Sequence, residues 1–241
     1  MQKAGIAWIS GGGLDSFKPK WGFTLAEVLI TLGIIGIVAA ITLPSLITKK
    51  QTKELQVGLQ KGYSLISQVM QLMEYGEGQP ITPETYATHK FAPVFDKYLV
   101  SAKACNDGCL IIRQDESDEN GTSIGFDFAD YKTYNKRAKV AGNLMDNGQF
   151  LLRNGMTIYM ENETVTYISI DVNGMYKGPN LWGHDLFTFQ LMNNGKMLPM
   201  GAEGTAYDSD KFCSTSSTSK YNGIACTNKA LTDSDYWNNL P

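Results

Sequence analysis

The sequence has few of the side chains that catalysis and metal binding commonly use. It contains two histidines, His89 and His184, and its four cysteines include no Cys-x-x-Cys pair. It lacks a Gly-x-Ser-x-Gly elbow, a His-Glu-x-x-His motif and a phosphate-binding glycine loop. Its formal net charge is −3, whereas nucleic-acid binders typically have an excess of basic residues. The charge therefore argues against a nucleic-acid-binding protein. We therefore expect neither an enzyme nor a zinc site, and we do not expect nucleic acid as a partner.

Charge is also missing from a long segment near the N-terminus. Residues 28–43 carry no charged side chain, and the only charge within Leu25–Ile47 is that of Glu27. A helix over Leu25–Ile47 would rise about 34 Å, enough to cross a hydrocarbon core of about 30 Å. A carboxylate in such a segment costs several kcal/mol unless it is paired. The pattern predicts a transmembrane helix over residues 23–47 and a partner for Glu27.

The residues around Glu27 form a processing motif. Gly22-Phe23-Thr24-Leu25-Ala26-Glu27 follows two lysines and opens the apolar segment, and it resembles the N-terminus of type IV pilins and type II secretion pseudopilins. The resemblance implies a leader over residues 1–22, removed by a prepilin peptidase that cuts between Gly22 and Phe23 and N-methylates Phe23. It also implies that Glu27 neutralises the N-terminal amine of a neighbouring subunit during filament assembly. An ordinary signal anchor with a buried glutamate is the alternative.

The same resemblance implies a location and a set of partners. The chain would be a single-pass protein of the bacterial inner membrane with its head in the periplasm, later extracted into an envelope-spanning or extracellular filament. Its partners would be itself and other pilins or pseudopilins, the prepilin peptidase, the inner-membrane assembly platform and the lipid bilayer. Lys49, Lys50 and Lys53 flank the far end of the apolar segment as strongly as lysines flank its near end, so the orientation rests on the resemblance.

Two other functions are compatible with these residues. A minor pilin at a filament tip would bind a surface, a substrate or DNA through its head. A membrane-anchored envelope protein that never assembles would have no need of Glu27 for assembly. The aromatic side chains that could serve binding, or could equally pack the head, are Trp182, Tyr207, Tyr221, Tyr236 and Trp237.

The helix is expected to continue beyond the membrane over residues 48–76. Apolar side chains recur there every three or four residues, which is the pattern of a helix with one buried face. Gly33 and Gly36 in the first half either allow close approach between the helices of neighbouring subunits or are merely tolerated in a membrane helix, and we favour the first interpretation. Pro44 is expected to bend the helix without ending it, as the resemblance to pilins also implies. The apolar stripe consists of Leu55, Leu59, Tyr63, Ile66, Met70 and Met73.

Strand patterns dominate the predicted head, residues 77–241. Asn154-Gly155 is the strongest hairpin signal, and Asn193-Asn194-Gly195 marks a second hairpin. Thr82-Pro83-Glu84 predicts the start of a helix that carries the apolar residues between Phe91 and Leu99. The expected strands are Ser123–Tyr131, Gln149–Arg153, Met156–Glu161, Thr164–Asp171, Asp185–Leu191 and Met197–Met200. The predicted fold class is α+β and pilin-like, with a long N-terminal helix packed on an antiparallel β-sheet head.

The cysteines are even in number and lie in two local groups. In an envelope protein that faces an oxidising compartment, disulfides are their expected use. Their spacing favours Cys105 with Cys109 and Cys213 with Cys226, although four cysteines allow three connectivities. The second bridge would clip the C-terminal region, and such a clip resembles the disulfide-bounded region of many pilins.

The segment from Asp171 to Asp185 is dense in turn formers and in oxygen ligands. Asp171, Asn173 and Asp185 could converge on calcium, which prefers such oxygens, and major pseudopilins carry a calcium site in their C-terminal loops. The segment lacks the 12-residue EF-hand spacing and its closing glutamate. Asx turns and glycines with positive φ explain the same residues without a metal. The turn interpretation leads, and no other cofactor is expected.

Overall fold

The computed structural model describes residues 22–88, 90–99, 131–145 and 147–241. The chain divides into two units, one ending at Ile47 and one comprising Thr48–Pro241. The helices are α1 (Leu25–Glu77), α2 (Phe91–Tyr98) and α3 (Cys226–Thr232), with short 3₁₀ helices η2 (Gly142–Leu144), η3 (Asp210–Phe212) and η4 (Tyr236–Asn238). The strands are β1 (Gly148–Leu151), β2 (Thr157–Asn162), β3 (Thr166–Asp171), β4 (Leu186–Leu191) and β5 (Met197–Pro199).

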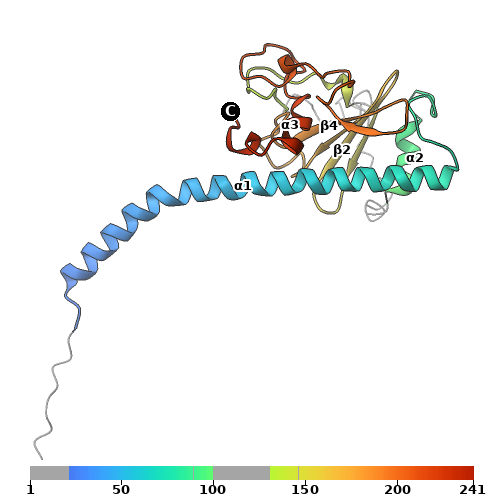
Figure 1. Ribbon diagram of the computed structural model, residues 1–241. Helices are drawn as coiled ribbons and strands as arrows, with labels where there is room; N and C mark the ends of the chain where they lie inside the picture. The colour runs from blue at the N-terminus through green and yellow to red at the C-terminus, as the bar shows by residue number, and fades with distance from the viewer. Residues whose placement is uncertain (1–21, 89, 100–130, 146) are drawn as a thin grey trace, which may run out of the picture. The chain divides into compact units, whose positions relative to one another are not determined.

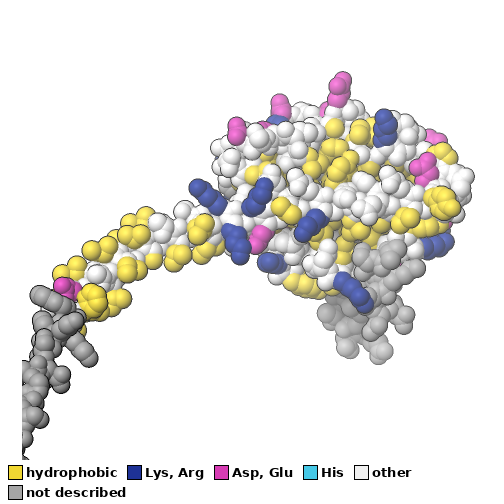
Figure 2. Space-filling model, turned by 60° about the horizontal axis from the view of Figure 1, so that its bottom comes forward, with side chains coloured by type: hydrophobic (Ala, Val, Ile, Leu, Met, Phe, Trp, Pro, Cys, Tyr) yellow, Lys and Arg dark blue, Asp and Glu magenta, His cyan; other side chains and the backbone are white. Residues whose placement is uncertain are grey.

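The first unit consists of the apolar half of α1. Its large apolar side chains are exposed, and Figure 2 shows them as a hydrophobic covering of this half of the helix. Hydroxyl groups in it are satisfied by the helix's own carbonyls, as where Thr42 Oγ1 donates to Val38 O at 2.9 Å. The helix also continues through Pro44. This segment is long and apolar enough to span a membrane.

The second half of α1 packs on one face of the sheet in the head unit (Figure 1). Leu59, Ile66 and Met73 are fully buried there, as the apolar stripe predicted. Tyr63 stacks on Phe189 of β4, with ring centroids 5.1 Å apart. Gly58 and Gly62 lack side chains where the helix passes close to Val172, just after β3, and to Ile170 of β3. The predicted α+β class, a long helix on an antiparallel sheet, is confirmed.

The sheet is an antiparallel meander in the order β1-β2-β3-β4-β5. The β1–β2 turn is Asn154-Gly155, and Gly155 has a φ of 88° that favours glycine. Side chains of β3 alternate between two cores: Ile168 and Ile170 face α1, whereas the neighbouring Tyr167 faces a second cluster that contains Trp182. Because both faces are covered, β2, β3 and β4 are buried along their whole length.

One sequence-based expectation differs from the structure, and three others lie wholly or almost wholly outside the described residues. Thr82-Pro83-Glu84 does not start a helix, because the Thr85 hydroxyl accepts a hydrogen bond from Thr82 N at 2.8 Å and closes a turn, and α2 begins at Phe91. The leader up to residue 21, the pair Cys105 and Cys109, and all of the expected strand Ser123–Tyr131 except its last residue lie outside the described residues.

Candidate functional site

The residues on either side of the predicted cleavage point precede α1 and are not helical. Gly22, Phe23 and Thr24 are all exposed, and the Phe23 side chain has an exposed fraction of 90%. Nothing lies within 4 Å of the position that a Cβ on Gly22 would occupy. The peptide bond between Gly22 and Phe23 is therefore open to an incoming enzyme.

Thr24 and Glu27 together cap the start of α1. Thr24 N and Thr24 Oγ1 both donate to Glu27 Oε2, at 2.7 and 2.8 Å, and Glu27 N donates to Thr24 Oγ1 at 3.2 Å. This reciprocal arrangement is a capping box, in which residue N3 and the N-cap satisfy each other's backbone donors. The carboxylate of Glu27 thus has a partner within its own chain.

The capping box was not among the features predicted from the sequence, although the sequence holds its signal. Thr24-x-x-Glu27 directly before an apolar run is the pattern that predicts such a box. All the hydrogen bonds to the Glu27 side chain involve Oε2, and among the described residues none involves Oε1. Glu27 can therefore cap the helix through Oε2 and still offer Oε1 to a second partner.

The disulfide between Cys213 and Cys226 is present, with Cα atoms 5.0 Å apart. Cys226 begins α3 and is fully buried in the core that faces α1. Inside the closed loop, Asn222 exchanges hydrogen bonds with Ser214, through Ser214 N to Oδ1 at 3.0 Å and Nδ2 to Ser214 O at 2.8 Å. The bridge therefore fastens an ordered, polar loop to the core.

The turn between β3 and β4 is built around Asp171 and Asp185. Asp171 Oδ1 accepts from Asn173 N and Gly174 N at 3.1 and 2.8 Å, and Oδ2 accepts from the Tyr131 hydroxyl. Asp185 accepts from Asn180 N and Leu181 N, both at 2.7 Å. The contacts of Asp171 are an Asx turn, as the leading interpretation predicted. Asp185 instead accepts from N–H groups that precede it in the chain, so its carboxylate holds the turn together without forming an Asx turn.

The calcium alternative concerns the same carboxylates. Asp171 and Asp185 are both fully buried and close enough that the charge of Asp171 acts on Asp185. Asn173 Oδ1 and Asn180 Oδ1 are both buried, and neither has a hydrogen-bond partner among the described residues. Asn180 is a residue that the sequence did not single out. In the described part of the chain, no group of three or more His, Cys, Asp or Glu side chains is arranged to hold a metal ion. Calcium binding by Asp171, Asn173 and Asp185 stays a prediction.

Burial shifts the acid–base behaviour of this region. It raises the pKa of Asp171, and burial together with the charge of Asp171 raises the pKa of Asp185. The pKa of Tyr131 is raised by burial and by the charge of Asp171. His184 lies 3.2 Å from Tyr134 O through Nε2, and burial lowers its pKa to about 4.

Most of the aromatic side chains considered for binding pack the head instead. Trp182 is fully buried and donates from Nε1 to Thr188 Oγ1 at 3.0 Å. Tyr236 and Trp237 belong to the core that faces α1. Tyr207 and Tyr221 are half-buried and lie against each other, with ring centroids 5.2 Å apart.

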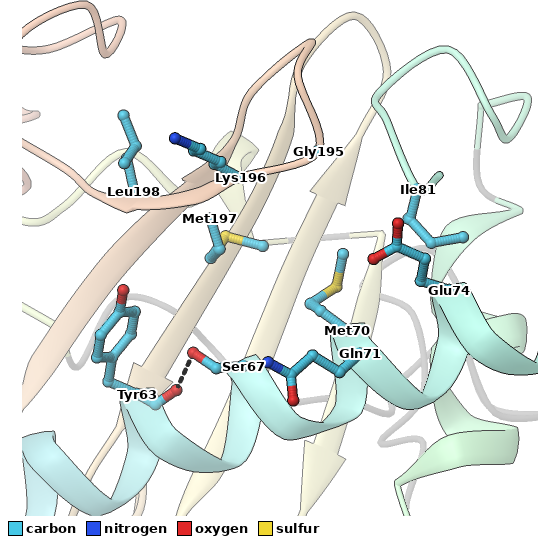
Figure 3. Close-up of a pocket in the computed structure, with 10 residues that line it drawn as sticks. All are labelled: Tyr63, Ser67, Met70, Gln71, Glu74, Ile81, Gly195, Lys196, Met197 and Leu198. Carbon is cyan, nitrogen blue, oxygen red and sulfur yellow. Dashed lines mark hydrogen bonds between the residues drawn. The ribbon is translucent and has the colours of Figure 1, made fainter. Parts of the chain in front are cut away.

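A hollow of about 380 Å³ lies between α1 and the β4–β5 hairpin. Figure 3 shows Tyr63, Ser67 and Met70 on the helix side and Lys196 and Met197 on the strand side. The Ser67 hydroxyl is used within the helix, donating to Tyr63 O at 2.8 Å. Of the described residues that line the hollow, Glu74 and Lys196 are the charged ones.

No family model matches this chain, and neither curated proteins nor solved structures gave a match. The architecture of a long, half-apolar N-terminal helix on an antiparallel sheet with a C-terminal disulfide is consistent with a pilin-like protein.

Proposed function

We propose that the chain is a membrane-anchored structural subunit of a type IV pilus or a type II secretion pseudopilus. A prepilin peptidase would cut between Gly22 and Phe23 and methylate the new amine of Phe23. The head would face the periplasm, and subunits would then be extracted from the inner membrane into a helical filament by an assembly platform. The partners are therefore copies of this chain and other pilins or pseudopilins.

The placement of the processing motif is the observation that carries this proposal. The peptide bond to be cut lies in exposed, non-helical chain immediately before α1, and Glu27 lies one turn inside the helix. Cleavage would place a charged amine on Phe23, next to the Thr24 that already holds Glu27. The unused Oε1 of Glu27 supports a second contact, with the amine of a neighbouring copy.

The exposed apolar half of α1 supports the same proposal. It would contact lipid before assembly and neighbouring helices afterwards. Nothing in the described part of the chain lies within 4 Å of the position that a Cβ would occupy on Gly33 or on Gly36, so no packing among these residues requires glycine there. Close approach between helices of different subunits accounts for small residues at these two positions.

Substitution of Glu27 by Gln and by Ala separates assembly from helix capping. Gln at the third helical position preserves a capping box, because its side-chain oxygen can still accept from Thr24 N, but it carries no charge. We expect E27Q and E27A both to enter the membrane and both to lose filament assembly. If E27Q assembles like the wild type while E27A does not, Glu27 acts only as a cap and the proposed amine pairing is wrong.

The same experiment distinguishes the proposed filament subunit from an anchored envelope protein that never assembles. Such a protein forms no filaments with any residue at position 27, and its membrane insertion does not depend on Glu27. The tip-binding alternative has weaker support, because Trp182, Tyr236 and Trp237 are buried in the two cores.

A further inference from the structure

A group of basic side chains follows directly after the apolar half of α1. Residues 48–62 carry a net charge of +3 (4 − 1), whereas the whole chain carries −3. Figure 2 shows dark blue Lys and Arg side chains gathered along the helix at this end of the head. All five charged residues of the segment are exposed: Lys49, Lys50, Lys53, Glu54 and Lys61.

Two of these lysines line a hollow of about 460 Å³ on the head unit. Its wall on α1 also holds the hydroxyls of Thr48 and Thr52, one helical turn apart, and the side chain of Gln56. Its opposite wall is formed by Trp237 and Asn238 of η4. Among the described residues, those that line the hollow include Lys49 and Lys53 and no aspartate or glutamate.

The charges of Lys49 and Lys53 are not balanced by nearby acids. Lys50, which does not line the hollow, is paired with Glu54 at 3.7 Å. Lys53 Nζ donates to Gln56 Oε1 at 3.0 Å, a neutral partner. Among the residues that the structure describes, no carboxylate lies within 4.0 Å of the ammonium of Lys49 or Lys53. The hollow is thus suited to an anion supplied from outside the chain.

A second hollow on the other side of Thr48 and Thr52 differs in charge. It has a volume of about 510 Å³ and is lined by both Glu54 and Lys177, so its wall contains a carboxylate as well as an ammonium group. The charge imbalance is therefore a property of the Lys49–Lys53 hollow and not of every surface around this part of α1.

We propose that the Lys49–Lys53 hollow binds the phosphate of an anionic phospholipid while the subunit is in the membrane. The inference rests on the membrane anchoring in the proposed function. Lys49 is two residues beyond the apolar segment, which places the hollow at the level of the lipid head groups. Lysine ammonium groups bind phosphate as point charges.

The structure favours a lipid over a nucleic acid as the source of the phosphate. The Trp237 ring is buried to all but 6%, and its Nε1 donates to Ala230 O at 2.9 Å, so the ring cannot stack on a base. Release of the phosphate would accompany withdrawal of the subunit from the bilayer.

Native mass spectrometry of the full chain tests this site. The chain would be purified in a non-ionic detergent with an equimolar mixture of phosphatidylglycerol and phosphatidylethanolamine, and the retained lipids counted. We expect the wild type to prefer phosphatidylglycerol about tenfold, since each lysine near an anionic head group favours binding several-fold. The double variant K49Q/K53Q should lose this preference. The matched variant K50Q/K61Q removes the same charge from the same helix outside the hollow and should keep the preference within about twofold.

Three results would overturn the proposal. They are no preference in the wild type, an equal loss in both double variants, and displacement of the lipid by a short DNA duplex at comparable concentration. The second would indicate diffuse charge and the third a general polyanion surface. Retention of phosphatidylglycerol should be unchanged in E27A. A chain that is never cut after Gly22 but still selects phosphatidylglycerol would contradict the proposed function and would still support the lipid site.

Discussion

Gly62 of α1 lies directly against Ile170 of β3. A Cβ placed on Gly62 would be 2.7 Å from Ile170 Cδ1, closer than side-chain atoms normally approach. By contrast, a Cβ placed on Gly33 in the apolar half of the same helix would have nothing within 4 Å. The two glycines therefore differ in what surrounds them, although both lie in one continuous helix.

Substitution of these glycines by leucine should have different effects. G62L should destabilise the head by about 1–3 kcal/mol, because the larger side chain would push α1 away from the sheet. G33L should leave the stability of the head unchanged and reduce filament assembly. Thermal unfolding followed by near-UV circular dichroism measures the first effect, and electron microscopy of sheared filaments measures the second. Normal assembly of G33L would contradict a packing role for Gly33.

Removal of the Cys213–Cys226 disulfide should weaken the head. The bridge closes a loop with a sequence separation of 13, for which the loss of loop-closure entropy corresponds to about 3 kcal/mol. The variant C213A/C226A should therefore unfold at a lower denaturant concentration than the oxidised wild type. Addition of a reductant to this variant serves as the control, because it should cause no further loss through this bridge. Equal stability of the variant and the oxidised wild type would contradict this role for the bridge.

Protonation of His184 should destabilise the head at acidic pH. Burial lowers its pKa from 6.5 to about 4, so the unfolded chain binds a proton more readily than the folded chain in this window. Stability from this residue is fully present above about pH 6.5 and is lost as the pH falls towards 4. The advantage of the wild type over H184Q should shrink by about 2 kcal/mol across that range. A constant difference from pH 7 to pH 4 would show that His184 does not titrate as described.

The pair Asp171 and Asp185 should act in the opposite direction. Burial raises both pKa values, and the charge of Asp171 raises that of Asp185 further, so the folded chain binds protons more readily than the unfolded chain above about pH 4. The contribution of the pair to stability is present at low pH and declines as the pH rises through the raised pKa values. In D185N this decline should be smaller. The variant should also be less stable overall, because the amide nitrogen that replaces one carboxylate oxygen would face the N–H of Asn180 or Leu181. Denaturant unfolding at pH values from 4 to 8 measures the slope.

Calcium provides a separate test of the same turn. If Asp171, Asn173 and Asp185 bind calcium, millimolar calcium should raise the unfolding temperature of the wild type and not that of D185N. An identical response of the two proteins would leave the carboxylates with the structural role that their hydrogen bonds describe.

The features that were predictable from the sequence are those with a strong local pattern. The spacing of Leu59, Ile66 and Met73 indicated the buried face of α1, and Asn154-Gly155 indicated the first hairpin. The helix start expected at Thr82 was wrong because local hydrogen bonding by threonine hydroxyls competed with helix capping. Short polar segments of this kind have several low-energy local structures, so the rest of the chain decides between them.

The residues of the candidate site could be predicted from the sequence, whereas their contacts in the folded chain could not. Glu27 stood out because it is a charge in an apolar segment, yet its pairing with Thr24 depends on where the helix begins. The hollow beside Lys49 and Lys53 was not predictable, because Trp237 and Asn238 come from the far end of the chain. Contacts between such distant segments are set by tertiary packing and leave no local pattern.

The N-terminal residue of the chain purified from membranes is the most direct test of the proposed function. Mass spectrometry of the N-terminal peptide should find N-methylphenylalanine at Phe23, with residues 1–22 absent. A chain that retains Met1, or one that is cut at a different bond, would contradict the proposal that it is processed and assembled as a pilin-like subunit.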